Sequence, residues 1–294
     1  MTCRDYIEIN NCERLPVFSM DHIMRCGSLF IEWGKKTYIM GILNVTPDSF
    51  SGDGVGCDIG LALERALTLQ NDGADIIDIG GESTRPGSSP LDLDEERRRL
   101  IPVVRHLTAK LSIPISVDTY KSKLAEEAID AGASMINDVW GLKYDASMAD
   151  VVSRGNVPVI LMHNQYGSEY SDLIPDVIDG LGKSVERAIE SGIREENIIL
   201  DPGIGFGKTP SQNLQLIRRL AEIKEMGFPL LIGTSRKSTL GLVLDLPVED
   251  RLEGTASTVA ISIANGVDIV RVHDVKEMRR VSLMSDAIVR GWDG

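Results

Sequence analysis

The sequence has little that would direct the protein to a membrane. Its 294 residues include no apolar run near the roughly 18 to 20 residues that a membrane-spanning helix needs. Residues 1–16 mix acidic, basic and polar side chains and contain no hydrophobic segment, so we expect no secretory signal there. The expected location is the cytoplasm.

Positive charge is also scarce. The chain has 31 lysine and arginine residues against 44 aspartate and glutamate residues, which gives a formal net charge of −13 at pH 7. Nucleic acids and anionic membrane surfaces attract basic proteins, so neither is an expected partner. A small anionic substrate is compatible with this charge, because it needs only a local group of cations.

Cysteine is rare and irregularly spaced. The four cysteines, Cys3, Cys12, Cys26 and Cys57, form no C-x-x-C pair and no disulfide framework. His22 lies near three of them in the sequence, but the spacings differ from the close ligand pairs of zinc sites. We therefore expect reduced thiols rather than a zinc site.

From residue 38 onward the sequence alternates regularly between short β-rich runs and helical runs. Residues 61–69, 124–129 and 214–221 have apolar side chains three and four positions apart and end shortly before a glycine, as amphipathic helices do. The expected strands are 38–43, 75–80, 114–117, 133–137, 157–162, 197–200, 229–233 and 268–272. Eight such units in about 250 residues predict an α/β fold, the (β/α)₈ TIM barrel.

A doubly wound open sheet is the alternative fold. The dinucleotide-binding glycine fingerprint is missing after the first strand, and eight evenly spaced units favour a closed barrel. Residues 18–40 contain two weakly alternating runs separated by a turn, which predicts a short hairpin that covers the barrel floor. We therefore expect an N-terminal extension, residues 1–36, and one barrel domain, residues 37–294.

The segment NIILDPGIGFGKT, residues 197–209, shows the pattern that suggests function. It places Asp201 at the mouth of a buried strand, where an unpaired charge costs several kcal/mol. The glycines that follow let the backbone approach a ligand closely. A tight turn with a capping aspartate is the alternative, but polar residues follow the other predicted strands as well. Two long loops rich in Gly, Pro and Ser, residues 46–58 and 85–92, also follow strands, as active-site lids do.

The polar residues at the predicted strand ends, where (β/α)₈ barrels have their active sites, form two chemical groups. Carboxylates and an amide suit a flat heterocycle with several N–H donors, and this group is Asp118, Asn137 and Asp201. Donors and cations suit phosphate oxygens, and this group is Asn44, Thr84, Arg85, Arg271 and His273. Lys237 fits either group. The set predicts a site for a neutral heterocycle and a diphosphate.

Taken alone, each residue has a structural alternative. Asp118 fits a helix N-cap, His273 fits a buried structural histidine, and Arg236 with Lys237 fits a solvated cationic turn. The arginine run 97–99 is expected to form a solvated helix face with i,i+4 acid pairs.

Nine segments resemble the dihydropteroate synthases and occur in that family's order. They are GILNVTPDSFS (41–51), DIGGESTRPG (78–87), SVDTYK (116–121), INDVWGL (136–142), LMHN (161–164), DPGIGFGK (201–208), GTSRKS (233–238), RLEGTA (251–256) and VRVHDV (270–275). Together they extend over essentially all of the chain after its first 36 residues.

The resemblance implies a transferase of folate synthesis, in which 4-aminobenzoate displaces diphosphate from 6-hydroxymethyl-7,8-dihydropterin diphosphate to give 7,8-dihydropteroate. It implies that the pterin meets Asp118, Asn137, Asp201 and Lys237, and that the diphosphate meets Asn44, Thr84, Arg85, Arg271 and His273. The implied aminobenzoate pocket is Pro86, Phe206, Arg236 and Ser238, and the implied catalytic residues are Asp118, Lys237, Arg271 and His273. Mg²⁺ with Asn44 as its ligand, a homodimer and sulfonamide binding are also implied.

One loop departs from the family's pattern. Residues 51–58 read SGDGVGCD, where the family has a short Asp-Gly-Gly turn, so the geometry of the first loop is expected to differ. Two other functions would use part of the same pattern. A methyltetrahydrofolate methyltransferase shares the ring-binding set but does not need the STRPG, GTSRKS or VRVHDV segments. A non-catalytic pterin-binding paralogue would keep the pocket without turnover, and the altered loop is its only support.

Overall fold

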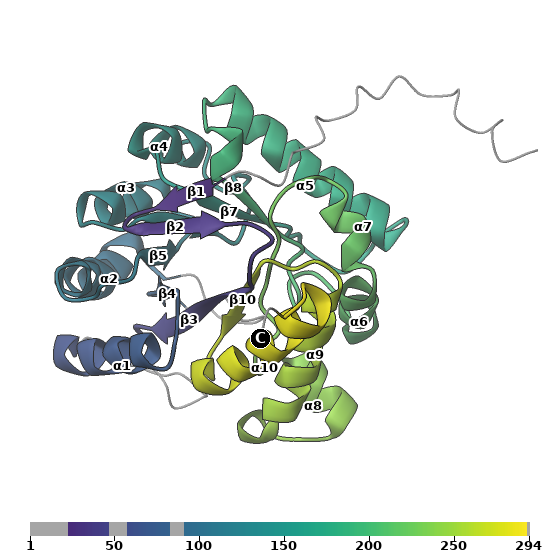
Figure 1. Cartoon of the computed structure of the whole chain (residues 1–294). Coiled ribbons are helices and arrows are strands. Elements are labelled where there is room, and N and C mark those ends of the chain that lie inside the picture. Colours follow the sequence, from purple (N-terminus) through teal and green to yellow (C-terminus); the bar gives the residue numbers. More distant parts are fainter. Residues whose placement is uncertain (1–22, 47–57, 83–90, 293–294) are drawn as a thin grey trace, which may run out of the picture.

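Eight parallel strands form the centre of the fold. The computed structural model describes residues 23–46, 58–82 and 91–292 (Figure 1). The strands are β3 (Tyr38–Asn44), β4 (Ile76–Gly80), β5 (Ile115–Asp118), β6 (Met135–Asp138), β7 (Val159–Met162), β8 (Ile198–Asp201), β9 (Leu231–Ile232) and β10 (Ile269–Val272). They pair in the order β8-β7-β6-β5-β4-β3-β10-β9. Each lies within a predicted strand or extends one by a residue, so the eight predictions are confirmed.

The sheet closes into a barrel. A bridge between Leu200 and Leu230 joins the two ends of the strand order, and the Leu200 N–H donates to the Pro229 carbonyl at 2.9 Å. This contact excludes the open doubly wound sheet, in which the edge strands stay apart. Because all eight strands are parallel, their carboxyl ends meet at one face of the barrel, where the predicted polar residues gather.

Helices surround the barrel. They are α1 (Ile59–Asn71), α2 (Leu93–Thr108), α3 (Ser122–Asp130), α4 (Met148–Gly155), α5 (Leu173–Glu190), α6 (Pro210–Arg218), α7 (Leu220–Lys224), α8 (Ser238–Leu244), α9 (Leu252–Ala264) and α10 (Val275–Val289). Within the described part of the chain, none of them is both long enough and apolar enough to cross a membrane. The helix predicted over residues 214–221 is divided between α6 and α7 at Arg219, so that prediction is wrong in its continuity.

The arginine run on α2 is more than a solvated face. Arg99 forms the expected i,i+4 pair with Glu95, and Arg98 pairs with the same carboxylate at i,i+3. Arg97 also reaches Glu127 on α3, so it joins two neighbouring helices. The prediction of acid pairs is confirmed, and the solvated interpretation is correct for Arg98 but wrong for Arg97 and Arg99, whose side chains are 35% and 17% exposed.

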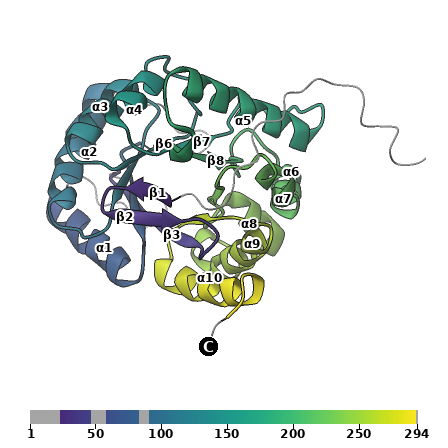
Figure 2. The same cartoon turned by 45° about the horizontal axis from the view of Figure 1, so that its top comes forward.

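The predicted hairpin is present and closes the floor of the barrel. Strands β1 (Ile23–Cys26) and β2 (Leu29–Glu32) pair antiparallel around Gly27, whose φ of +57° favours glycine. Met24, Cys26 and Ile31 are buried against strand residues, among them Tyr38, Met40, Ile76, Met135, Ile160, Ile199, Leu231 and Ile269. Figure 2 shows the hairpin lying across the barrel.

Cys26 is a buried free thiol, as expected of a reduced cysteine. Burial raises the pKa of its thiol to about 12, which makes it unreactive. Cys3, Cys12, Cys57 and His22 lie outside the described residues, so the prediction of reduced thiols is confirmed for Cys26 alone.

The hairpin offers a direct test of how much the floor contributes to stability. Ile31 is fully buried, whereas its neighbour Phe30 points away and is 62% exposed. We expect Ile31→Ala to lower the free energy of unfolding by about 2 to 5 kcal/mol, because it removes buried methyl groups and leaves a cavity. Phe30→Ala is the matched control and should change it by less than about 0.5 kcal/mol. Urea unfolding would measure both, and equal effects would contradict this packing.

Candidate active site

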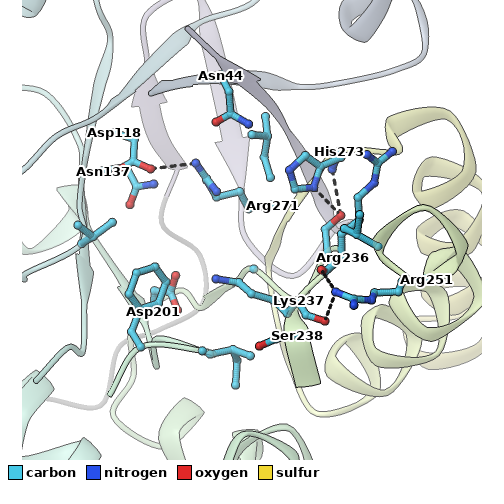
Figure 3. Close-up of a pocket in the computed structure, with 18 of the residues that line it drawn as sticks. Asn44, Asp118, Asn137, Asp201, Arg236, Lys237, Ser238, Arg251, Arg271 and His273 are labelled. Carbon is cyan, nitrogen blue, oxygen red and sulfur yellow. Dashed lines mark hydrogen bonds and ion pairs between the residues drawn. The ribbon is translucent and has the colours of Figure 1, made fainter. Parts of the chain in front are cut away.

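A cavity of about 650 Å³ opens at the carboxyl ends of the barrel strands. All the predicted site residues that the structure describes line it: Asn44, Asp118, Asn137, Asp201, Phe206, Arg236, Lys237, Ser238, Arg271 and His273. Figure 3 labels all of these except Phe206. The predicted residues Thr84, Arg85 and Pro86 lie outside the described residues. So do residues 47–57 and 83–90, and with them most of the two predicted lid loops.

Arg271 is at the centre of the polar contacts in the cavity. From β10, its Nε donates to Asp78 Oδ2 at 2.6 Å and its Nη2 donates to Asp118 Oδ2 at 2.9 Å. The Asn137 amide donates to the same Asp78 oxygen at 3.1 Å. One guanidinium therefore fixes two carboxylates from adjacent strands, β4 and β5, and Asp78 in turn orients Asn137.

Asp78 is not among the predicted site residues. It is fully buried within β4, in the run IIDIG, and it lies beneath the cavity wall rather than in it. A carboxylate inside an otherwise apolar buried strand was the signal that could have identified it, because such a charge needs a partner. Its partner, Arg271, is 193 residues away in the sequence.

Two buried carboxylate oxygens have no hydrogen-bond donor among the described residues. They are Asp78 Oδ1 and Asp118 Oδ1. A buried acceptor without a donor loses its hydration with no compensation, and native proteins rarely leave one so. Asp118 lines the cavity, so a ligand that presents an N–H or a developing positive charge would satisfy its oxygen.

Burial raises the pKa values of two aspartates toward neutral pH. It raises the pKa of Asp118 to about 7, although the positive charge of Arg271 acts in the opposite direction. It raises the pKa of Asp201 to about 6, although the Gly203 N–H donates to its Oδ1 at 2.7 Å and Lys237 is nearby. Both carboxylates would gain from a ligand that donates hydrogen bonds to their ionised forms.

The glycine-rich turn after β8 brings Phe206 and Lys237 together. Gly203 has a φ of +73°, and a Cβ there would lie 2.0 Å from the His163 carbonyl oxygen, so only glycine fits. Lys237 Nζ lies 4.3 Å from the centre of the Phe206 ring, a cation–π contact. Lys208 supports the turn from beneath, because its Nζ donates to the Phe206 carbonyl at 2.9 Å. The turn therefore forms an aromatic and cationic wall beside Asp201.

The wall beyond the ends of β9 and β10 carries an imidazole and a guanidinium that are each held by a partner. Ser235 Oγ lies 2.9 Å from His273 Nδ1, and the Arg236 guanidinium forms two hydrogen bonds with the Asp274 carboxylate, at 3.1 and 2.5 Å. Arg251 donates to the Arg236 carbonyl at 3.1 Å, which supports a backbone that has a φ of +56° at Arg236. The supporting roles of Asp274 and Arg251 were not predicted.

The three structural alternatives are now excluded. Asp118 is not a helix N-cap, since α3 has Lys121 at that position. Arg236 and Lys237 do not form a solvated turn, since one is paired with Asp274 and the other lies against Phe206. His273 lines the cavity instead of lying in the core.

Comparisons with known proteins agree with this geometry. The family model described as pterin binding enzyme matches residues 40–273. The chain is 51% identical to the dihydropteroate synthase of Clostridium beijerinckii, over 91% of this chain and 100% of that protein. A dihydropteroate synthase structure from Clostridium difficile in the presence of pteroic acid has a TM-score of 0.85 at 52% identity, covering 88% and 99% of the two chains. The Yersinia pestis enzyme with a sulfonamide drug gives 0.86 at 38% identity, covering 91% and 99%.

The raised pKa of Asp118 makes the stability of the fold depend on pH. An aspartate in the unfolded chain has a pKa near 3.9, so between about pH 4 and 7 the folded protein binds more protons at Asp118 than the unfolded chain does. The free energy of unfolding should therefore fall as the pH rises from 5 to 8, and Asp118→Asn should make that fall smaller. Urea unfolding at both pH values would measure it.

The control for this experiment is Asp130→Asn, which changes an exposed carboxylate at the end of α3 and should leave the difference between pH 5 and pH 8 unchanged. An Asp118→Asn variant with the same difference as the unaltered protein would contradict the raised pKa.

Proposed function

The chain belongs to the dihydropteroate synthase family of transferases, and we propose that its cavity joins 4-aminobenzoate to 6-hydroxymethyl-7,8-dihydropterin diphosphate. The products are 7,8-dihydropteroate, a folate precursor, and diphosphate. The proposal rests mainly on the arrangement around Arg271. The acceptors Asp118, Asn137 and Asp201 lie on one side of this residue, and Asn44 and His273, which we assign to phosphate, lie on the other.

The acceptor wall suits the pterin ring. The amino-pyrimidinone edge of a pterin presents N–H donors and a carbonyl acceptor, which match a carboxylate and an amide. We assign Asp201 and Asn137 to this edge, and we assign Lys237, beside Asp201, to the ring carbonyl. Asp118, with one oxygen held by Arg271 and the other without a donor, lies under the same ring.

In the proposed reaction the C–O bond to diphosphate breaks as the C–N bond to aminobenzoate forms. Negative charge builds on the departing diphosphate, and Arg271 and His273 stabilise it. Thr84 and Arg85 are proposed for the same role. Positive charge spreads from the methylene carbon into the electron-rich dihydropterin, where the Asp118 carboxylate stabilises it. The amine of aminobenzoate is already nucleophilic, and after attack it gives up one proton to diphosphate or water, so no strong base is needed.

Mg²⁺ fits this site only together with the substrate. The described residues contain no group of three or more His, Cys, Asp or Glu side chains that could hold a metal. Mg²⁺ often takes one or two protein oxygens and fills its other positions with phosphate oxygens and water. Asn44, at the end of β3 and on the cavity wall, would supply one such oxygen. When bound, the ion would neutralise charge on the leaving diphosphate.

The aminobenzoate pocket is proposed beside the glycine-rich turn. Phe206 would pack on the benzene ring, and Ser238 and Arg236 would border its carboxylate. Asp274 holds the Arg236 guanidinium at the cavity edge and so fixes its position. Pro86 keeps its proposed place on this pocket. Sulfonamides, one of which is bound in the Yersinia pestis structure, would compete with aminobenzoate here.

The two rival functions are disfavoured. The chain matches a curated dihydropteroate synthase over that protein's full length, which a methyltetrahydrofolate methyltransferase would not be expected to do. The non-catalytic paralogue had only the sequence of residues 51–58 in its favour, and residues 51–57 lie outside the described residues.

We also propose that the protein is cytoplasmic and that its barrel domain begins after residue 36. In addition, we propose a homodimer. The homodimer is supported by large apolar side chains that are exposed on three neighbouring helices. They are Leu242 and Val243 on α8, Ile261 on α9, and Leu283, Met284 and Ile288 on α10. Apolar patches of this kind often mark protein interfaces.

Two substitutions test the proposed chemistry. Asp118→Asn keeps the shape of the side chain but removes the charge beneath the ring, and Lys237→Ala removes the cation beside Asp201. Each should lower kcat/KM for dihydropteroate formation by about 100-fold or more, which is roughly 2.7 kcal/mol of transition-state stabilisation. Steady-state kinetics with both substrates and Mg²⁺ would measure the effect.

The matched control is Lys276→Ala, which removes an exposed lysine on α10 and should leave the rate unchanged. Circular dichroism should show an intact fold in all three variants. If the two site variants kept nearly the unaltered rate, the proposed site would be wrong.

A further inference from the structure

An asparagine buried behind the cavity joins two segments of its wall. Asn213 lies in α6, the helix that follows the glycine-rich turn, and it is 2% exposed. Its side-chain Oδ1 accepts from the Gly205 N–H at 2.8 Å, and its Nδ2 donates to Thr239 Oγ1 at 3.0 Å. This one amide therefore bridges the turn after β8 and the first turn of α8.

Each end of the bridge lies next to a residue of the proposed aminobenzoate pocket. Gly205 lines the cavity and immediately precedes Phe206, and Thr239 immediately follows Ser238. Consecutive Cα atoms are only about 3.8 Å apart, so a shift of either end of the bridge moves the pocket residue beside it. The bridge thus sets the separation between two walls of the pocket.

Packing alone does not explain an asparagine at this position. The other fully or nearly fully buried residues of α6, Leu216 and Ile217, are apolar, as expected for a helix face packed on a barrel. Asparagine is a weaker helix former than leucine, and a buried amide loses its hydration. Such an amide is tolerated when its polar atoms have partners, and Asn213 has one on each. Its place is therefore explained by the bridge.

We propose that Asn213 is a positioning residue for the aminobenzoate pocket. It holds Gly205 and Thr239 together, and thereby sets how Phe206 and Ser238 face the aminobenzoate ring between them. The inference rests on the proposed function, since that function assigns these two side chains to aminobenzoate.

The pterin residues nearest to the bridge are held by other contacts. Asp201 accepts from the Gly203 N–H at 2.7 Å, and the Lys237 N–H donates to the Thr234 carbonyl at 3.2 Å. Asn213 takes part in neither bond. Loss of the bridge is therefore expected to affect aminobenzoate and to leave the affinity for the pterin nearly unchanged.

The test separates the binding of aminobenzoate from turnover. Asn213→Ala removes both hydrogen bonds of the bridge and should raise the KM for 4-aminobenzoate by about 10-fold. The kcat at saturating aminobenzoate should stay within about threefold, because the groups that stabilise the leaving diphosphate are unaltered. The Kd of 6-hydroxymethyl-7,8-dihydropterin, measured by isothermal titration, should stay within about twofold. A merely structural role would lower the amount of active protein, and hence kcat, without changing the KM.

Two variants of Thr239 keep the test decisive if Asn213→Ala does not fold. Thr239→Val keeps the shape of the side chain but removes the hydroxyl, so it breaks one bond of the bridge and should raise the KM for aminobenzoate by about 3- to 10-fold. Thr239→Ser keeps the hydroxyl and should leave the KM within about twofold of that of the unaltered protein.

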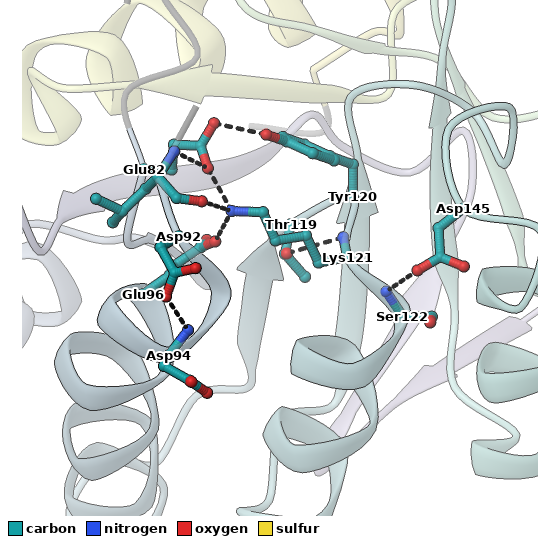
Figure 4. Close-up of polar contacts among 10 residues, drawn as sticks. Glu82, Asp92, Asp94, Glu96, Thr119, Tyr120, Lys121, Ser122 and Asp145 are labelled. Atoms are coloured by element: carbon teal, nitrogen blue, oxygen red, sulfur yellow. Dashed lines mark hydrogen bonds and ion pairs between the residues drawn. The ribbon is translucent and has the colours of Figure 1, made fainter. Parts of the chain in front are cut away.

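The matched control removes a bond of the same kind on another side of the barrel. The Asp145 carboxylate accepts from the Ser122 N–H at 2.9 Å and so joins the segment before α4 to the start of α3 (Figure 4). Asp145→Ala should lower the free energy of unfolding, measured with urea, because it also removes a hydrogen bond that holds a loop. It should leave the KM for aminobenzoate within about twofold.

The outcomes separate this inference from the proposed function. If Asn213→Ala and Thr239→Val left the KM for aminobenzoate unchanged, or weakened pterin binding to the same extent, the positioning role would be wrong, while formation of dihydropteroate by the unaltered protein would uphold the proposed function. If the unaltered protein formed no dihydropteroate, both would be overturned. A raised KM with retained kcat and pterin affinity, which Thr239→Ser does not show, supports the role.

Discussion

The site depends on one guanidinium shared between two buried carboxylates. Arg271 enters from the last strand of the barrel and meets Asp78 and Asp118, which lie 193 and 153 residues earlier in the chain. These contacts need the first and last strands of the barrel to be paired, because the side chains of β10 face those of β4 and β5 only when β10 lies beside β3. The fold is thus the condition for the site, and a buried charge that would be costly alone becomes part of a fixed arrangement.

That arrangement also gives the cavity two chemically unlike parts. Two carboxylates share a single guanidinium, and each retains an oxygen without a donor, so this part of the site has acceptor capacity to offer a ligand. On the other wall Ser235 holds the His273 imidazole and Asp274 holds the Arg236 guanidinium, and these partners fix the direction of both side chains. Preorganised groups of this kind stabilise developing charge without having to rearrange during the reaction.

Much of this could be predicted from the sequence, because the governing signals are local. Each barrel strand is a short apolar run with a polar residue at its end, and that pattern identified all eight strands and the wall residues from Asn44 to His273. What could not be predicted depends on contacts between distant residues. Nothing near Asp78 reveals that Arg271 holds it, and the pairing of Arg236 with Asp274 spans 38 residues. The break between α6 and α7 at Arg219 contains no glycine or proline from which it could be predicted.

We propose that this cavity couples departure of diphosphate to capture of aminobenzoate. The most direct measurement is release of diphosphate from the pterin diphosphate, with 4-aminobenzoate and Mg²⁺ each omitted in turn and the pterin product identified. We expect release that depends on aminobenzoate, is weakened without Mg²⁺, and yields one dihydropteroate for each diphosphate. Thermal stabilisation by the pterin diphosphate without any product, at any protein concentration, would contradict it and leave a binding protein in place of an enzyme.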